Sequence, residues 1–246
     1  MSPPPDNVIL CEGYHDRAFL AGWLEALGCT SCKDKEYRRG KPLRGRGQFG
    51  FYHTTRDVWA RVVPVRGDGN MYPEAELILE GAKTDPIANL VRVVDRDTNT
   101  DAGELGMRRA SFEGFLAKVG ANGGRFVGFI DTQIRLVEWH VADAPATVDL
   151  PAKETLERLV CAAIQEVYPA RGQAIASWLQ SRPDPPRGEK AHKTIAASHM
   201  AGWYSERGYE GLFGAVWEDA QTRAALGRLL EDARRELAWL VPLAEA

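Results

Sequence analysis

Two apolar runs that each end at a carboxylate constrain the fold of this chain most strongly. Residues 8–11 read Val-Ile-Leu-Cys and lead into Glu12, and residues 90–94 read Leu-Val-Arg-Val-Val and lead into Asp95. An apolar run bounded by polar residues is typical of a strand buried on both faces, and such strands belong to parallel sheets covered by helices. The sequence therefore predicts an α/β fold.

The carboxylates that follow these runs are expected to meet at one edge of the sheet. The carboxyl ends of parallel strands lie at the same edge, where α/β proteins bind their ligands, and alternation along a strand turns Asp95 and Asp97 to the same side. Clustered carboxylates stay charged near neutral pH only when a cation neutralises them, and an all-oxygen ligand set favours Mg²⁺, with Mn²⁺ as a substitute. We therefore predict a metal site at Glu12, Asp95 and Asp97. The alternative is a helix-start glutamate and a solvated strand end.

The motifs around these residues resemble the Toprim domain, which is shared by topoisomerases, bacterial primases, ribosomal-RNA maturation nucleases and overcoming-lysogenization-defect nucleases. A strand ends in Glu12-Gly13, Asp16 and a helix follow, and a later strand ends in Asp95-x-Asp97. The resemblance covers roughly residues 7–165, and its motifs are short. It implies a mostly parallel four-stranded sheet flanked by helices, and it adds Asp16 to the metal ligands; otherwise Asp16 is a helix-start carboxylate.

The same resemblance implies a further acidic ligand. In the overcoming-lysogenization-defect type, a helix brings another Glu to a second metal. The helix expected at residues 153–160 offers Glu154 and Glu157, and Glu157 fits the Leu-Glu-x-Leu form better. Glu138, in the strand before that helix, is a rival.

The resemblance also implies a lysine near the scissile phosphate, where a point charge would stabilise developing negative charge. A helix expected over residues 189–203 carries Lys190 and Lys193 on one face. The more common role of a helical lysine is an exposed, solvated one. The loop over residues 66–70 would border the metal site or form an ordinary turn.

A glycine-rich basic insertion is expected at about residues 30–57. Basic groups beside aromatic residues suit phosphate contacts and base stacking, although a solvated loop has the same composition. We predict nucleic-acid contacts from five residues: Arg38, Arg39, Lys41, Arg44 and Arg46. Cys29 and Cys32 have the spacing of half a zinc knuckle, but no second half follows, so zinc is not predicted.

The predicted organisation is a Toprim-like α/β domain over residues 7–181 and a helical segment over residues 182–246, beginning at a proline-rich linker. Residues 136–141 are favoured over 125–130 as the fourth parallel strand. Leucines recur through residues 222–240 at helical spacing, so this stretch caps the core or forms a homodimer seam. The other expected elements are a strand at 61–65 and helices at 16–27, 74–83 and 110–119.

The composition limits the classes of partner. The 246 residues include 31 Lys and Arg and 34 Asp and Glu, which gives a formal net charge of −3 and a pI near 6.0. Because the whole chain is slightly acidic, any nucleic-acid binding must come from a local basic surface. No run approaches the length of a membrane span and no signal segment is recognised, which predicts a cytoplasmic protein without a membrane partner. Because no Walker-type loop is present, an ATP-driven system would need a separate ATPase protein.

The predicted function is Mg²⁺-dependent hydrolysis of DNA or RNA. Glu12 would hold a metal and act as, or orient, the general base, Asp95 and Asp97 would complete the cluster, and a lysine would assist the transition state. The alternative is a non-catalytic nucleic-acid-binding or regulatory module. The chain has no room for the separate gating or template-binding regions of a topoisomerase or primase. Antiphage defence is implied only by the resemblance.

Overall fold

The computed structural model describes residues 4–32, 37–39, 43, 47–53, 57–82, 84–96, 102–121, 132–141, 149–184 and 189–240. Every structural statement below concerns these residues. Among them, no helix is long and apolar enough to cross a membrane.

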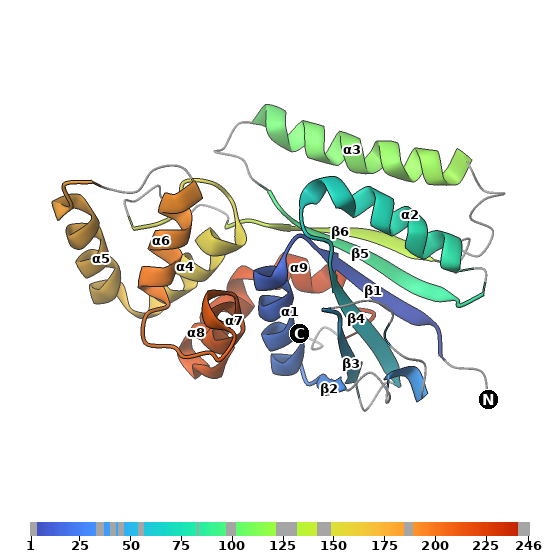
Figure 1. Cartoon of the computed structure of the whole chain (residues 1–246), viewed down its shortest axis with the longest axis horizontal. Helices are drawn as coiled ribbons and strands as arrows, with labels where there is room; N and C mark the ends of the chain where they lie inside the picture. The colour runs from blue at the N-terminus through green and yellow to red at the C-terminus, as the bar shows by residue number, and fades with distance from the viewer. Residues whose placement is uncertain are drawn as a thin grey trace.

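A six-stranded sheet in the order β2-β3-β4-β1-β5-β6 forms the centre of the fold (Figure 1). The strands are β1 (Asp6–Cys11), β2 (Thr30–Cys32), β3 (Phe49–His53), β4 (Val58–Pro64), β5 (Ile87–Asp95) and β6 (Gln133–Trp139). The four strands β4, β1, β5 and β6 are parallel, whereas β2 and β3 are antiparallel additions next to β4. The prediction of a mostly parallel α/β sheet is confirmed, but the sheet has six strands and not four.

The apolar runs are central strands because both of their faces are buried. Along β1, Ile9 and Cys11 belong to one hydrophobic cluster, and Val8 and Leu10 belong to another on the opposite face. The same alternation continues along β5. Burial on both faces is the environment in which an uninterrupted apolar strand is stable.

Helices cover both faces of the sheet. The pair α2 (Met71–Gly81) and α3 (Ala102–Ala121) lies on one face, and α1 (Tyr14–Ala26) lies on the other (Figure 1). A group of helices lies beyond the carboxyl ends of β5 and β6 in the same view; it contains α4 (Leu156–Val167), α5 (Pro169–Ser181) and α6 (Glu189–His199). The chain then forms α7 (Gly208–Ala215), α8 (Ala220–Leu229) and α9 (Glu231–Glu236).

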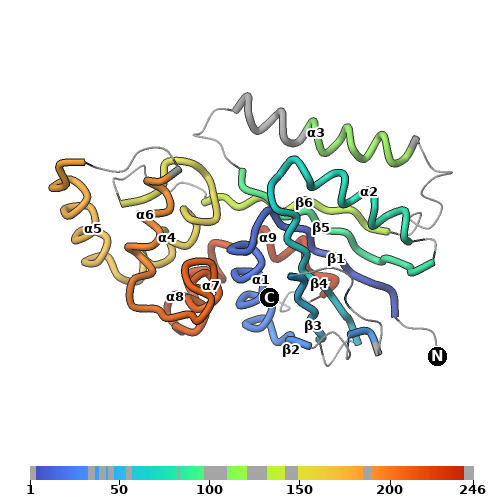
Figure 2. The backbone as a smooth tube through the Cα atoms, viewed as in Figure 1, coloured from blue at the N-terminus to red at the C-terminus, as the bar shows by residue number. Residues whose placement is uncertain are grey.

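The C-terminal helices share a hydrophobic cluster with α1. Helix α7 packs directly on α1, although the two are far apart in sequence (Figure 2). Leu226, Leu230, Leu237 and Leu240 are buried in the same cluster as the α1 side chains. These leucines therefore pack in the core, but residues 222–240 do not form the single helix that their spacing predicts, because α8 ends at Leu229 and α9 begins at Glu231.

Other predicted boundaries shift in ways that affect the site. Strand β6 pairs in parallel with β5, as predicted for residues 136–141, and the competing stretch 125–130 lies outside the described residues. Helix α4 begins at Leu156, because Thr155 caps it by accepting a hydrogen bond from the Arg158 N–H, and not at residue 153. Glu154 therefore precedes the helix, although the sequence predicts that it lies within it.

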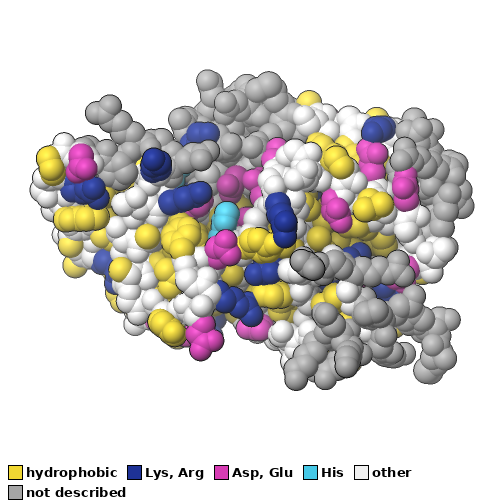
Figure 3. All heavy atoms as spheres, in the orientation of Figure 1, with side chains coloured by type: hydrophobic (Ala, Val, Ile, Leu, Met, Phe, Trp, Pro, Cys, Tyr) yellow, Lys and Arg dark blue, Asp and Glu magenta, His cyan; other side chains and the backbone are white. Residues whose placement is uncertain are grey.

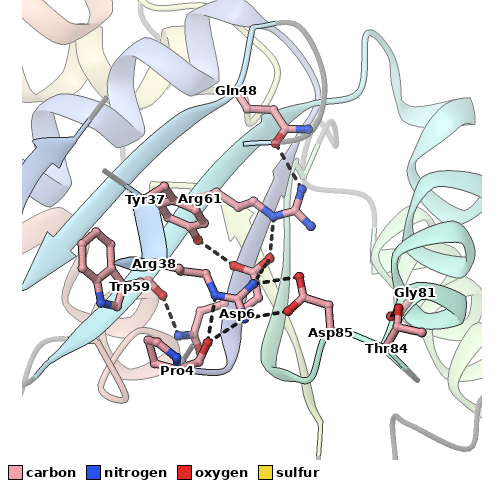
Figure 4. Close-up of polar contacts among 11 residues, drawn as sticks. Pro4, Asp6, Tyr37, Arg38, Gln48, Trp59, Arg61, Gly81, Thr84 and Asp85 are labelled. Carbon is pink, nitrogen blue, oxygen red and sulfur yellow. Dashed lines mark hydrogen bonds and ion pairs between the residues drawn. The ribbon is translucent and has the colours of Figure 1, made fainter. Parts of the chain in front are cut away.

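Arg38, predicted to contact nucleic acid, is instead a buried structural residue (Figure 4). Its Nη1 and Nη2 donate to the two carboxylate oxygens of Asp85 at 3.0 and 2.8 Å, and its Nε donates to the Pro4 carbonyl at 2.8 Å. Asp6 lies 3.6 Å from Nη1 and also accepts hydrogen bonds from Tyr37 and Arg61. Only 1% of Arg38 is exposed, so its guanidinium is not available to a phosphate.

Candidate functional site

Four carboxylates gather at the carboxyl ends of the central strands, and we call them the acidic cluster: Glu12, Asp16, Asp95 and Glu157. Glu12 follows β1 directly, and Asp95 is the last residue of β5. Asp16 lies in the first turn of α1, and Glu157 lies in the first turn of α4. Asp16 and Glu157 are almost fully buried, with 1% and 6% exposed.

Asp95 connects the two strand ends to α4. Its backbone N–H donates to Glu12 Oε1 at 3.1 Å, and its own Oδ1 accepts from the Leu156 N–H at 2.8 Å. Leu156 is the first residue of α4, and the N-terminus of a helix favours a nearby negative charge. Strand β1, strand β5 and helix α4 are thus held at one point.

Asp16 is fixed by two hydrogen bonds from different elements. The Gly13 N–H donates to Asp16 Oδ2 at 2.9 Å, which is the helix-start interaction that a carboxylate at this position can make. The Trp139 indole Nε1 donates to Asp16 Oδ1 at 2.9 Å from strand β6. His15 Nε2 lies 3.5 Å from the same carboxylate. Asp16 therefore caps α1 and also faces the acidic cluster.

When the four carboxyl groups of the acidic cluster are ionised, they repel one another and lack part of the solvation that water would give them. Burial raises the pKa of Asp95 well above its usual value, and the charges of Asp16, Glu12 and Glu157 raise it further. Burial also raises the pKa of Asp16, against the lowering effects of His15 and the Trp139 hydrogen bond. Low local dielectric and like charge both favour the protonated carboxyl. A bound cation would reverse this preference.

The donor chemistry of the cluster fits a hard divalent ion, because all four side chains supply carboxylate oxygens. However, no group of three or more His, Cys, Asp or Glu side chains in the described part of the chain is arranged to hold a metal ion. Backbone N–H groups and the Trp139 indole take up several of the carboxylate oxygens. Asp97, the third predicted ligand, lies outside the described residues.

The two rivals to Glu157 have other environments. Glu154 accepts a hydrogen bond from the Val141 N–H at 2.8 Å and lies 3.2 Å from the Arg158 Nε, so it braces the loop before α4. Glu138 is next to Val137 and Trp139, which belong to the core on the α1 side, so alternation points Glu138 to the opposite face. Of the three glutamates, the structure brings Glu157 to the cluster.

The predicted lysines lie on α6 and are both exposed. Lys193 lines a shallow hollow together with Tyr209. Burial raises the pKa of Tyr209, and the charge of Glu157 raises it further, but no residue of the acidic cluster lines this hollow in the part of the chain that the structure describes. In the described part of the chain, Lys190 forms no hydrogen bond or ion pair with the acidic cluster. Lys41, Arg44, Arg46 and the side chain of Arg39 lie outside what the structure describes.

The loop after β4 contacts the site through Gly67 but not through Asp68. The Gly67 N–H donates to the Glu12 carbonyl at 2.9 Å, which holds the loop against the Glu12-Gly13 turn. Asp68 instead forms an ion pair with Arg92 at 2.6 Å, and Arg92 also donates to the Tyr72 hydroxyl on α2. Asp68 therefore belongs to the α2 face of the sheet.

Basic and aromatic residues outside the predicted set form a group that begins at Tyr14 and Arg17, next to Asp16 on α1. They are Tyr14, Arg17, Phe49, Arg66 and Arg207. Arg17 is three positions after Tyr14 on a helix, a spacing that places them together, but Arg207 is joined to them only by the tertiary fold. On the face drawn in Figure 3, acidic side chains gather near the middle around a histidine, with Lys and Arg side chains on either side.

Comparisons with known proteins identify a similar fold and no function. No family model matches the chain, and no curated protein matches it. A solved structure, the crystal structure of the hypothetical protein PH0156 from Pyrococcus horikoshii OT3, is similar with a TM-score of 0.60 and 13% identity. The match covers 95% of this chain and 100% of that one. At this identity the likeness concerns the α/β fold alone.

Proposed function

We propose that the protein is a Mg²⁺-dependent nuclease of Toprim type. The observation that carries the proposal is the acidic cluster, in which carboxylates from β1, α1, β5 and α4 meet at the carboxyl edge of a parallel sheet. This edge is where α/β folds bind ligands. Buried like charges are costly to a fold, and a site that binds a cation gives a functional reason for keeping them.

The residues of the cluster would have different roles. Asp95 and Glu12, at the two strand ends, would be the primary ligands, because the Asp95 backbone and the Leu156 N–H hold them in place. Glu157, which the α4 N-terminus brings to the cluster, would hold a second ion. Asp16 would orient the Glu12-Gly13 turn through its bond from the Gly13 N–H. When bound, Mg²⁺ would lower the pKa of a water nucleophile and accept charge from the leaving oxygen.

A binding module without catalysis is the second candidate function. It is favoured by the hydrogen bonds that the cluster already accepts, because backbone N–H groups and the Trp139 indole occupy carboxylate oxygens of Asp95 and Asp16. In that case the acidic cluster would be a structural network, and nucleic acid would be bound but not consumed.

Cleavage assays distinguish the two functions. Wild type, Glu12→Gln and Asp95→Asn would be incubated with plasmid DNA, single-stranded DNA and transfer RNA in Mg²⁺, Mn²⁺ or EDTA. We expect wild type to degrade at least one substrate only with metal, and both variants to lose this activity by orders of magnitude. The matched control is Glu231→Gln with Asp232→Asn, whose side chains are 71% and 75% exposed on α9. Activity that survives EDTA or the Asp95→Asn change would refute the metal mechanism.

Thermal melting of the same proteins gives a readout that needs no substrate. Mg²⁺ should raise the melting temperature of wild type and of the α9 control, because a ligand that binds only the folded state stabilises it. Glu12→Gln and Asp95→Asn should lose most of this response. If Mg²⁺ shifts all four proteins equally or none of them, the binding module becomes the better explanation.

A further inference from the structure

Three arginines from distant parts of the chain gather around two aromatic rings, and we call them the arginine cluster: Arg17, Arg66 and Arg207. The Arg17 guanidinium carbon lies 4.7 Å from the centre of the Tyr14 ring and 4.1 Å from the centre of the Phe49 ring. Arg207 lies over the same Phe49 ring at 4.8 Å. Arg66 donates through Nε and Nη2 to the Tyr14 hydroxyl at 3.1 and 2.9 Å.

Within the arginine cluster, Arg17 and Arg207 lie over the same Phe49 ring and so hold like charges together without a salt bridge. Among the described residues, no carboxylate lies within ion-pair distance of these three side chains. Burial lowers the pKa of Arg17 and the charge of Arg207 lowers it further, while Cys11, Tyr14 and Glu210 offset part of this. The Arg17 Nε is buried with no hydrogen-bond partner in the described part of the chain. An anion bound here would relieve the repulsion.

The backbone at Arg66 is strained, and the Asn70 side chain holds it by donating to the Val65 and Arg66 carbonyls at 3.1 and 3.2 Å. Arg66 has a φ of 62°, in the left-handed region that costs a non-glycine residue roughly 1–2 kcal/mol. This conformation turns the chain so that Arg66 reaches Tyr14 while Gly67 bonds to the Glu12 carbonyl. Such strain is concentrated at functional sites, where the surrounding structure enforces it.

Two members of the arginine cluster, Arg17 and Arg66, lie next to residues of the acidic cluster. Tyr14, Asp16 and Arg17 all lie in the first turn of α1, and the loop that carries Arg66 is bonded to the Glu12-Gly13 turn. A phosphodiester strand has an anion at each successive nucleotide, so one strand can reach both clusters. Arginine guanidinium groups match the geometry of phosphate oxygens better than lysine ammonium groups do. Because the net charge of the chain is −3, nucleic acid must bind to a local basic surface of this kind.

We infer that the arginine cluster binds the backbone phosphates of a nucleic-acid strand that extends from the acidic cluster across Arg66 toward Arg207. This inference rests on the proposed function for the position of the scissile phosphate. It assigns substrate binding to residues outside the basic insertion. Arg17, which is held between two rings, would fix the position of the site, and the exposed Arg66 and Arg207 would contact phosphates.

The test measures binding without cleavage. Affinities of labelled single-stranded DNA, duplex DNA and single-stranded RNA oligonucleotides would be measured by fluorescence anisotropy in EDTA and in Ca²⁺, over a series of salt concentrations. The variant is Arg66→Gln with Arg207→Gln. The control is Arg228→Gln with Arg235→Gln, a pair with the same change in net charge whose side chains are 62% and 61% exposed on α8 and α9.

We expect the Arg66/Arg207 variant to bind about tenfold more weakly or worse. The slope of log K against log salt should fall by about 1.4 on a single strand, since each lost phosphate contact removes about 0.7. The control should stay within about twofold of wild type. The inference is overturned if wild type binds none of the oligonucleotides, if the variant keeps its affinity and slope, or if the control loses as much.

Cleavage by wild type in Mg²⁺ separates this inference from the proposed function. Arginine-dependent binding without cleavage would remove the nuclease proposal and leave the binding surface in place. Cleavage with unchanged binding by the Arg66/Arg207 variant would remove only the inference about the arginine cluster.

Discussion

Asp95 shows how a single residue can be costly to the fold and still be held in place. Its carboxylate accepts the first N–H of α4, which stabilises the charged form, but burial and three neighbouring carboxylates outweigh that bond. The net effect is a raised pKa. A carboxyl with this property makes the folded protein bind a proton more strongly than the unfolded chain does.

The stability of the metal-free protein should therefore depend on pH in a definite direction. Because the folded pKa of Asp95 is raised, its contribution to stability is fully present below the unfolded value of about 4 and is lost as pH rises through the folded value. Asp95→Asn keeps an oxygen for the Leu156 N–H and cannot ionise. In EDTA, we expect this variant to exceed wild type in free energy of unfolding at pH 8, with a smaller difference at pH 5.

Urea unfolding at the two pH values measures this difference. Asp184→Asn is the matched control, because the Asp184 side chain is 82% exposed, and it should give curves parallel to wild type at both values. An Asp95→Asn protein that is less stable than wild type at pH 8 would mean that the charged carboxylate stabilises the fold, as a helix-capping role alone requires.

At the scale of elements, the residues around Arg38 join β1, the turn at Tyr37–Arg39, β4 and the start of β5. Asp6 at the beginning of β1 accepts from Tyr37 on the turn and from Arg61 on β4, and Arg38 pairs with Asp85 before β5 (Figure 4). Burial would lower the pKa of Arg38, but the bonds and charges of Asp85 and Asp6 raise it overall. The guanidinium is therefore firmly charged inside the protein.

Removing one partner from this network should be strongly destabilising. Arg38→Met leaves carboxylates without their buried counter-charge, and we expect a loss of about 3–5 kcal/mol in the free energy of unfolding. Arg228→Met removes an exposed ion pair with Glu166 and should cost no more than about 1 kcal/mol. Both values come from urea titrations at pH 7. Equal stability of the two variants would contradict the structural role of Arg38. A loss of nucleic-acid affinity by folded Arg38→Met would support the binding role that the sequence predicts for Arg38.

The elements that the sequence predicts well are those whose signal is local. The runs before Glu12 and Asp95 identify central strands because burial on both faces demands uninterrupted apolar residues, and their carboxylates meet because parallel strands end at one edge. The sequence does not predict helix α7, because Gly208, Gly211 and Gly214 are typical of a loop. The ring contacts of Arg207 and the burial of Arg38 depend on partners far away in sequence, and composition does not distinguish those arginines from solvated ones.

At the scale of the whole molecule, the close approach of α1 and α7 joins the C-terminal helices to the sheet. A Cβ added at Gly214 would lie 2.9 Å from the Ala18 carbonyl oxygen, and one at Gly22 would lie 2.9 Å from the Gly214 carbonyl oxygen. Only glycine allows the two backbones to come this near. Because α1 also carries Asp16 and Arg17, the C-terminal helices help to position the candidate site.

This packing predicts that residues before and after 182 unfold as one unit. Gly214→Ala forces α7 away from α1, and overpacking of this kind costs about 1–3 kcal/mol, which lowers the melting temperature by about 2–4 °C for each kcal/mol. Gly227→Ala is the matched control: it lies on the exposed side of α8 with no atom within 4 Å of an added Cβ, so it should stabilise by about 0.5–1 kcal/mol. Tryptophan fluorescence and far-UV circular dichroism should give coincident urea transitions in all three proteins, shifted down in Gly214→Ala and slightly up in Gly227→Ala. Two separate transitions, or a Gly214→Ala protein as stable as wild type, would show instead that the C-terminal helices fold independently of α1 and do not position the site.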